Sequence, residues 1–426
     1  MSGRQAIMRQ MREEMEVGTS TLQQISADFC AAIEARSRGK ESSLQMLPSF
    51  LDLPTGKETG CFLALDFGGT NVRAMLVHLD GRTGTVVKQR SVPLRAVNGT
   101  YDYTAKTSSA EELFDFLARL IITVAEEQPV YYLGHTFSFP CRQISRSQAE
   151  LIAWTKEIAT PGVEGREVGS LLQAALDRHQ SRITQTAILN DTVGTLLAAA
   201  YRYSTADIGA ICGTGHNLCF RRAGTDRADP MIYNLESGNF SCLIQNRYDR
   251  LLDDASEKPG AQVMEKMVGG QYLGELVRRM ALGAADHGIL SPRCEQYLSQ
   301  PYSLTAIDLA CFLNPVFANR AANLRGFAVQ DEDFLAGLAY LACRRSARLA
   351  AAALVGVLRY SDPEVMRKHT IGIDGSLYRK FPGYADWLRS AVEEVLPDQV
   401  GALRITAVQD GSGIGAAIAA AIASPK

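Results

Sequence analysis

Short apolar runs alternate with amphipathic stretches along this chain, and the alternation predicts strands and helices in turn. The runs at 61–65 and 72–77 flank a glycine pair and predict a hairpin. Further apolar runs predict strands at 130–134, 186–190, 208–212, 370–374 and 403–408. Because a helical pattern follows most of these runs, we expect an α/β fold with ligands at the junctions between strands and helices.

Helix starts are predicted from capping residues and helical spacing. Ser20 with Gln23, and Ser108 with Glu111, have the spacing of a capping box, so we expect helices to begin at these two serines. A long helical pattern covers about 334–358.

Size and charge narrow the class of protein. A chain of 426 residues exceeds the size of one efficient core, so we expect two packed lobes. The net charge of -2 does not attract a polyanion such as nucleic acid, so we expect a small-molecule ligand and no nucleic acid.

The cellular setting is also predicted from composition. The nine cysteines form no Cys-x-x-Cys pair, which is typical of thiols in a reducing cytosol. The longest apolar stretches, at 350–358 and 413–423, are shorter than the ~20 residues of a membrane span, and no signal peptide is predicted. We therefore expect a cytoplasmic protein without membrane partners, as a monomer or homodimer.

Three glycine-rich turns are candidate phosphate sites: 66–71 (DFGGTN), 213–215 (GTG) and 410–415 (DGSGIG). Glycine lets backbone amides approach a phosphate, and free amides at a helix start attract anions. The spacing matches neither a P-loop nor a dinucleotide motif. Taken singly, each segment also fits an ordinary turn, and Asp66 also fits a solvated carboxylate.

Asn190 and Asp191 lie between a predicted strand and a predicted helix. A carboxylate in that place can accept a proton from a bound hydroxyl. It can equally serve as a helix N-cap, a position that Asp and Asn favour, and the residues alone leave both interpretations open.

The motifs taken together resemble the hexokinase family, in the order of that family and from about residue 61 to the C-terminus. They are LALDFGGTNVRAMLV, LGHTFSFPC, LIAWTKE, AILNDTVGTL, GTGHN, NLESGNF, MEKMVGGQYLGELVR, IGIDGSLY and QDGSGIGAA. The resemblance implies the two-lobed actin-like ATPase fold, related to ribonuclease H, with a central cleft. It also implies a small lobe of 61–189 and 411–426 and a large lobe of 1–60 and 190–410.

The resemblance further implies transfer of the γ-phosphoryl group of MgATP to the 6-hydroxyl of glucose or a related hexose, the first step of glycolysis. The implied sugar-binding residues are Ser138, Thr155, Lys156, Asn190, Asp191, Asn217, Glu236 and Glu265. Carboxylates and amides suit a ring of hydroxyls, each of which donates and accepts hydrogen bonds. Asp191 is the implied general base, and Lys156 the implied cation that offsets charge on the transferred oxygens. Outside such motifs, Lys156 would fit a solvated surface lysine and Glu265 a salt-bridged helix residue.

The same resemblance implies the nucleotide site. Its implied residues are Asp66, Gly68, Gly69, Thr70, Asn71, Gly213, Thr214, Gly215, Gly375, Ser376, Gly411 and Ser412. Asp66 is the implied Mg²⁺ residue, directly or through water.

Four positions depart from the family pattern. Ser237 replaces a bulky aromatic residue, Asn239 a small residue, His135 a phenylalanine and Gln409 an acidic residue. These departures concern the choice of sugar, so an N-acetylglucosamine or other hexosamine kinase is an alternative. A sugar-binding regulator without turnover is a second one, and a sugar-independent filament or chaperone ATPase a remote third.

Overall fold

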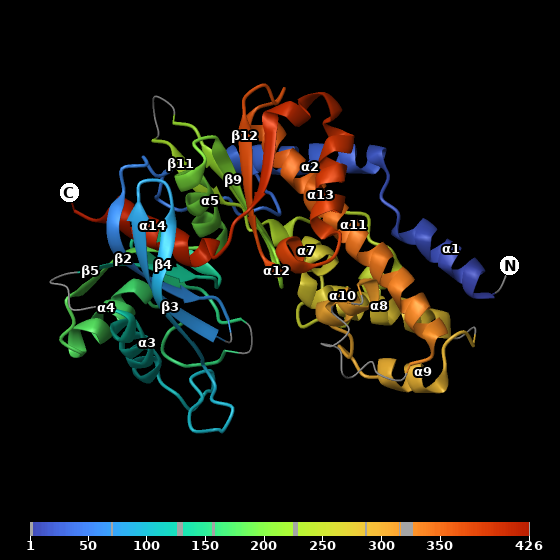
Figure 1. The fold of residues 1–426 in the computed structure, drawn as a ribbon, viewed down its shortest axis with the longest axis horizontal. Coiled ribbons are helices and arrows are strands. Elements are labelled where there is room, and N and C mark those ends of the chain that lie inside the picture. Colours follow the sequence, from blue (N-terminus) through green and yellow to red (C-terminus); the bar gives the residue numbers. More distant parts are fainter. Residues whose placement is uncertain are drawn as a thin grey trace.

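The structure is a computed structural model and describes residues 3–69, 71–125, 131–155, 158–224, 229–285, 288–314, 316 and 327–425. Two large sheets with their helices lie side by side, and the two chain ends lie at opposite ends of the molecule (Figure 1). The expectation of an α/β protein is confirmed by this element order. No helix of the described residues is long and apolar enough to cross a membrane.

The first sheet has five strands in the order β4-β3-β2-β5-β8. They are β2 (Thr59–Phe67), β3 (Asn71–Asp80), β4 (Gly84–Pro93), β5 (Tyr131–Phe137) and β8 (Ile183–Leu189). β2, β3 and β4 are antiparallel, with Phe67 opposite Val72 in the predicted hairpin, whereas β2, β5 and β8 are parallel.

Successive residues of β2 point to opposite faces of this sheet, and both faces are buried. Leu63 and Leu65 pack with α3 (Ala110–Val124) and α4 (Val168–Arg178). Ala64 packs with α14 (Gly411–Ala423) on the other face. The run CFLAL is therefore continuously apolar because helices cover both sides.

The second sheet has six strands in the order β1-β11-β10-β9-β12-β13. They are β1 (Leu47–Pro48), β9 (Ala206–Cys212), β10 (His216–Arg222), β11 (Met231–Asn234), β12 (His369–Asp374) and β13 (Leu403–Ala407). β9, β12 and β13 are parallel, and the others pair antiparallel. One face packs with α2 (Thr19–Ser37), α11 (Val329–Ser361) and α13 (Tyr384–Val395), and the other with α5 (Asp191–Arg202).

The remaining elements surround these sheets. They are α1 (Gly3–Met15), β6 (Cys141–Ser145), β7 (Gln148–Leu151), η1 (Ser237–Asn239), α6 (Arg247–Asp254), α7 (Val263–Val268), α8 (Gly270–Ala285), α9 (Pro292–Leu298), α10 (Ala306–Leu313), α12 (Ser376–Lys380) and η4 (Pro397–Ala402). Because α14 begins at Gly411, the predicted start of the last helix in the 410–415 turn is confirmed, whereas α12, which begins after Gly375, was not predicted.

Helices α5 and α14 cross between the two sheets at glycines. A Cβ built on Gly415 would lie 2.0 Å from the carbonyl oxygen of Gly194, and one built on Gly194 would lie 3.2 Å from the carbonyl oxygens of Gly411 and Ser412. Only the absence of side chains allows this approach, which ties the start of α14 to α5.

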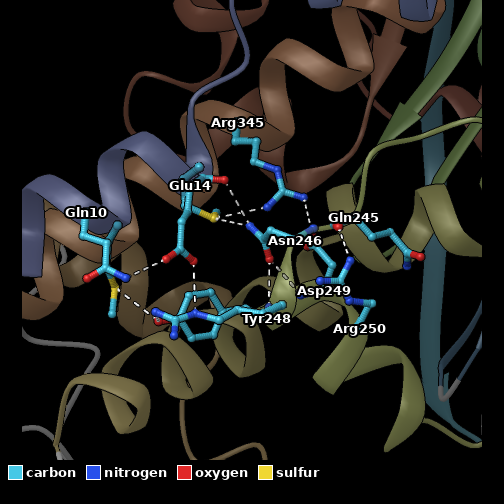
Figure 2. Close-up of polar contacts among 11 residues, drawn as sticks. Gln10, Glu14, Gln245, Asn246, Tyr248, Asp249, Arg250 and Arg345 are labelled. Atoms are coloured by element: carbon cyan, nitrogen blue, oxygen red, sulfur yellow. Dashed lines mark hydrogen bonds and ion pairs between the residues drawn. The ribbon is translucent and has the colours of Figure 1, made fainter.

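Helix α1 is fixed to α6 and α11 by polar contacts (Figure 2). The buried guanidinium of Arg345 donates to Asp249 at 2.6 Å. Asn246, which caps α6, donates to the backbone oxygen of Glu14 at 3.3 Å. This network holds α6, which follows Glu236 in the chain by about ten residues.

Two predicted helix starts are wrong by one or two residues. Helix α2 begins at Thr19 after Gly18 and has no side-chain cap. The capping box of α3 is Ser109 with Glu112, in place of Ser108 with Glu111. In both stretches several neighbouring serines and threonines have cap-like spacing, and packing of the apolar face selects among them.

Candidate active site

A connected set of amide and carboxylate groups runs from the start of α5 to the turn before η1. The Nδ2 of Asn217 donates to the Oδ1 of Asn190 at 3.4 Å and to the Oδ1 of Asn234 at 2.9 Å. The Nδ2 of Asn234 donates to the Oε1 of Glu236 at 2.7 Å. Three of the predicted sugar residues are thus brought together, with Asn234 as a link that the sequence did not indicate.

A hollow of about 450 Å³ that opens to solvent adjoins this set. Asn190, Asn234 and Glu236 line it from one side and Phe139 and Cys141 from the other. Burial, followed by the charge of Glu236, raises the pKa of Cys141 to about 12, so this thiol is protonated beside the carboxylate.

Asp191 is the first residue of α5 and directly follows β8 and Asn190. The N-cap of α5 is Asn190, whose Oδ1 accepts from the backbone N–H of Thr192 at 2.9 Å. Asp191 therefore stands in the first turn, where the helix dipole favours a negative charge. Its charge, after the larger effect of burial, raises the pKa of Cys219, whose Sγ lies 3.1 Å from the Thr192 oxygen.

Glu265 lies in α7 against the second glycine hairpin. Its Oε2 accepts a hydrogen bond from the backbone N–H of His216 at 3.0 Å. The same oxygen would lie only 2.5 Å from a Cβ on Gly215, so it approaches closely because residue 215 is glycine. Because Asn217 is the next residue along β10, Glu265 lies close to the amide and carboxylate set.

Ser138 and Thr155 belong to the side of the first sheet. Ser138 follows β5, and its backbone N–H donates to the oxygen of Phe67, next to the first glycine turn. Thr155 follows β7, and its backbone oxygen accepts from Ile158 at 3.3 Å. The predicted Lys156 and Thr70 lie outside the described residues.

The first and third glycine turns meet through charged groups. The Oδ2 of Asp66 accepts from the Oγ of Ser412 at 2.8 Å and from the Nη2 of Arg73 at 3.2 Å. The Nη1 of Arg73 donates to Asp410 at 2.7 Å. Asp66 therefore faces the start of α14 from β2.

Asp374 joins the turn before α12 to the third glycine turn. Its Oδ1 accepts from the N–H of Gly375 at 2.7 Å, and its Oδ2 accepts from the N–H of Gly411 at 2.9 Å. Gly375 has φ 113°, and a Cβ there would lie 2.3 Å from the oxygen of Cys212, so only glycine fits. A Cβ on Gly213 would stand 3.2 Å from the Gly375 Cα, which places these backbones in contact.

The other predicted nucleotide residues occupy the turns themselves. Gly68, Gly69 and Asn71 form the β2–β3 tip, Thr214 and Gly215 lie in the β9–β10 turn, and Ser376 begins α12. Asn71, Thr214 and Ser376 are exposed at these tips.

Sequence reasoning missed Arg73, Asn234 and Asp374 as members of the site, and it named the 410–415 turn without giving Asp410 a role. Arg73 carried a usable signal, since a charged residue interrupts an otherwise apolar strand. The other three stand at the end of a strand or in a turn, where polar residues are ordinary.

The four departures lie in different surroundings. Ser237 is completely buried, and its backbone N–H donates to the Oδ1 of Asn217. The Nδ2 of Asn239 donates to the backbone oxygen of Glu236. His135 is buried against Phe137, and burial lowers its pKa to about 3. Gln409 is exposed before α14.

Comparison with known proteins identifies the family. The two models of the hexokinase family match residues 7–201 and 207–422. The chain belongs to the hexokinase family. It is 33% identical to Hexokinase-7 of Oryza sativa subsp. japonica, over 97% of this chain and 96% of the relative. It is 32% identical to Hexokinase-2 of Schizosaccharomyces pombe, over 98% of this chain and 96% of the relative.

Solved hexokinases have the same fold. A structure described as a crystal structure of hexokinase superposes with a TM-score of 0.86 at 31% identity, covering 99% of this chain and 100% of that one. The Schistosoma mansoni hexokinase complexed with glucose superposes with a TM-score of 0.83 at 28% identity, covering 98% of this chain and 99% of that one. The expected two-lobed actin-like ATPase fold is therefore confirmed, and this hexokinase is a hexose phosphotransferase.

Proposed function

We propose that this hexokinase transfers the γ-phosphoryl group of MgATP to the 6-hydroxyl of glucose or a closely related hexose. The observation that carries the proposal is the hydrogen-bonded set of Asn190, Asn217, Asn234 and Glu236, which begins one residue before Asp191. The glucose complex of the S. mansoni relative supports glucose as the first candidate. This reaction would be the first step of glycolysis, and we propose a cytoplasmic location, although one relative is described as chloroplastic.

Sugar recognition is assigned to groups that lie on rigid elements. Asn190, Asn217 and Glu236 are already oriented by bonds to one another or to Asn234, so little side-chain freedom is lost when sugar hydroxyls bind. Ser138, Thr155 and Glu265 complete the proposed set. An acceptor that lacks one of these hydroxyls would leave a polar group unpaired, which is the basis of selectivity.

Asp191 is the proposed general base. A carboxylate there would accept the proton of the attacking hydroxyl, and the first turn of α5 holds the backbone of Asp191 in place. Gly194, three residues later, packs on Gly411 and Ser412, so Asp191 lies about 4.5 Å along α5 from the residue that contacts the third glycine turn. Lys156 is proposed to face the transferred oxygens.

The residues of the three glycine turns fit MgATP. Gly213 and Gly375 let the backbones of their two turns pack against each other with no side chain between them, and Ser412 lies beside the Asp66 carboxylate. One carboxylate together with substrate phosphates is the usual Mg²⁺ environment. When bound, Mg²⁺ would neutralise phosphate charge, and Arg73 would hold Asp66 and Asp410 in place.

The proposed lobes are 61–189 with 411–426, and 1–60 with 190–410. Packing of α14 on the first sheet and against α5 supports this division, since the chain returns to the small lobe at its last helix. We further propose that the lobes close on sugar. Oligomeric state stays a prediction of monomer or homodimer.

Hexosamine phosphorylation is the alternative that the assay must separate. Ser237 is completely buried and does not line the hollow, so the small residue there adds no room for an N-acetyl group. Glucose is therefore proposed first. A regulator without turnover is the other alternative.

The test is a coupled assay of ADP release with purified protein, MgATP and a panel of glucose, fructose, mannose and N-acetylglucosamine. We expect turnover with glucose and a fall of ~10² or more in kcat for Asp191→Asn, with glucose binding retained. Asp386→Asn, whose side chain is 80% exposed, is the matched control and should keep full turnover. Tight glucose binding without turnover by the unmodified protein would refute the proposal, and near-normal turnover by Asp191→Asn would remove Asp191 from the base role.

A further inference from the structure

A second hollow lies at the far end of the six-stranded sheet from the glycine turns. It encloses about 700 Å³, in part open to solvent, and is lined by Asp207 near the start of β9. The turn at Gly213 follows the other end of β9, about six residues away, which is roughly 20 Å at ~3.3 Å per residue. This hollow is therefore separate from the candidate active site.

Three arginines line the second hollow: Arg221, Arg222 and Arg367. Asp52 accepts from the Nε and Nη2 of Arg221 at 2.6 and 3.0 Å, and Tyr233 accepts from the Nη2 of Arg222 at 2.6 Å. These contacts fix both guanidinium groups in direction. Because a guanidinium carries five N–H donors, each retains donors beyond those used in these bonds.

Arg367 approaches from the segment before β12. Its Nη2 donates to the backbone oxygen of Ser361 at 2.9 Å, and its side chain is 63% exposed. Basic groups thus reach the hollow from two separate segments, β10 and the segment before β12. Guanidinium groups pair with the oxygens of phosphoryl and sulfuryl groups through parallel hydrogen bonds.

His369 lies behind Asp207 and is completely buried. Its Nδ1 contacts Asp207 at 2.7 Å and its Nε2 contacts Asp362 at 3.2 Å. Burial, and to a smaller extent the positive charge of Arg367, lower the pKa of His369. The hydrogen bond and the negative charge of Asp207, together with the hydrogen bond to Asp362, have the larger combined effect, so the pKa is raised above its ordinary value. The imidazolium offsets the charge of Asp207, which would otherwise repel an anion.

We propose that this second hollow is a binding site for a phosphoryl group, held by Arg221, Arg222 and Arg367 and separate from catalysis. The proposal does not depend on the reaction assigned to the active site.

The test uses sulfate as a probe whose charge is constant between pH 6 and pH 8.5, with affinity measured by titration calorimetry on the full chain. Arg367→Ala should weaken sulfate binding about tenfold, the scale of one lost charge-assisted bond. The matched control is Arg38→Ala, which removes a similarly exposed arginine (67%) from the C-cap of α2 and should leave the affinity unchanged. The urea unfolding midpoints of both variants check that the fold is retained. We expect no change in either midpoint, because both arginines are exposed.

Sulfate held at the glycine turns would not respond to Arg367→Ala, so an unchanged affinity in this variant overturns the proposal, as does the absence of binding. Affinity should also fall as pH rises and His369 loses its proton; a constant affinity would contradict the part assigned to His369. The affinities for inorganic phosphate and glycerol 3-phosphate then distinguish free phosphate from a phosphate ester as the source of the group.

Discussion

Replacement of Gly415 by alanine tests the crossing of α5 and α14 on which the active site depends. The new Cβ would stand 2.0 Å from the Gly194 oxygen and 2.4 Å from its carbonyl carbon and Cα. An ordinary contact is about 3.5 Å, so the helices must separate by roughly 1.5 Å or α14 must rotate. Backbone on both sides cannot yield as a flexible side chain can.

Two consequences follow, one for stability and one for activity. Overpacking of this kind costs about 1–3 kcal/mol, and we expect the upper part of that range because backbone atoms meet. A displacement of about 1 Å between reacting groups can cost ~10² in rate, and Asp191 and Ser412 stand on the two helices that separate. We therefore expect kcat to fall 10- to 100-fold, with a smaller change in the affinity for sugar.

The matched control is Gly401→Ala. A Cβ on Gly401 would meet no atom within 4 Å, and the backbone there needs no left-handed conformation. Urea unfolding can be followed by the fluorescence of Trp154 and Trp387. Because these two tryptophans pack against different hydrophobic cores, one beside each large sheet, their signals report the stability of both parts of the protein. If Gly415→Ala matched Gly401→Ala in both unfolding midpoint and kcat, the close crossing would not be required.

Two further predictions concern buried charges. Asp249→Asn should lower the free energy of unfolding by about 3–5 kcal/mol, because it leaves the buried Arg345 without its counter-ion, whereas Asp386→Asn at an exposed pair should cost below about 1 kcal/mol. Burial lowers the pKa of His135 to about 3 and of His216 to about 4, from 6.5 in the unfolded chain. The unfolded state therefore binds more protons below pH 6.5, so stability should fall from pH 6.5 toward pH 4 by up to ~1.4 kcal/mol per pH unit for each histidine. Urea unfolding at pH 7 and pH 5 measures this loss, which should be smaller in His135→Phe; an equal loss in that variant would contradict the assignment.

Local features of the sequence determined the elements and much of the candidate site. The hairpin around Gly68 and Gly69, the start of α5 after Asn190 and the start of α14 at Gly411 follow from turn chemistry and apolar spacing, which depend on near neighbours in the chain. The order of the motifs was sufficient to indicate the hexokinase family.

Only the tertiary structure decided which side chains meet. Arg73 reaches Asp410 across 337 positions, Asp374 bonds the amides of Gly375 and Gly411, and His369 lies between Asp207 and Asp362. The physical reason is that such contacts depend on how sheets and helices pack in space, whereas the periodicity of a sequence reports only the face on which a residue lies. A polar residue in a turn looks the same in the sequence whether it faces water or a partner hundreds of residues away.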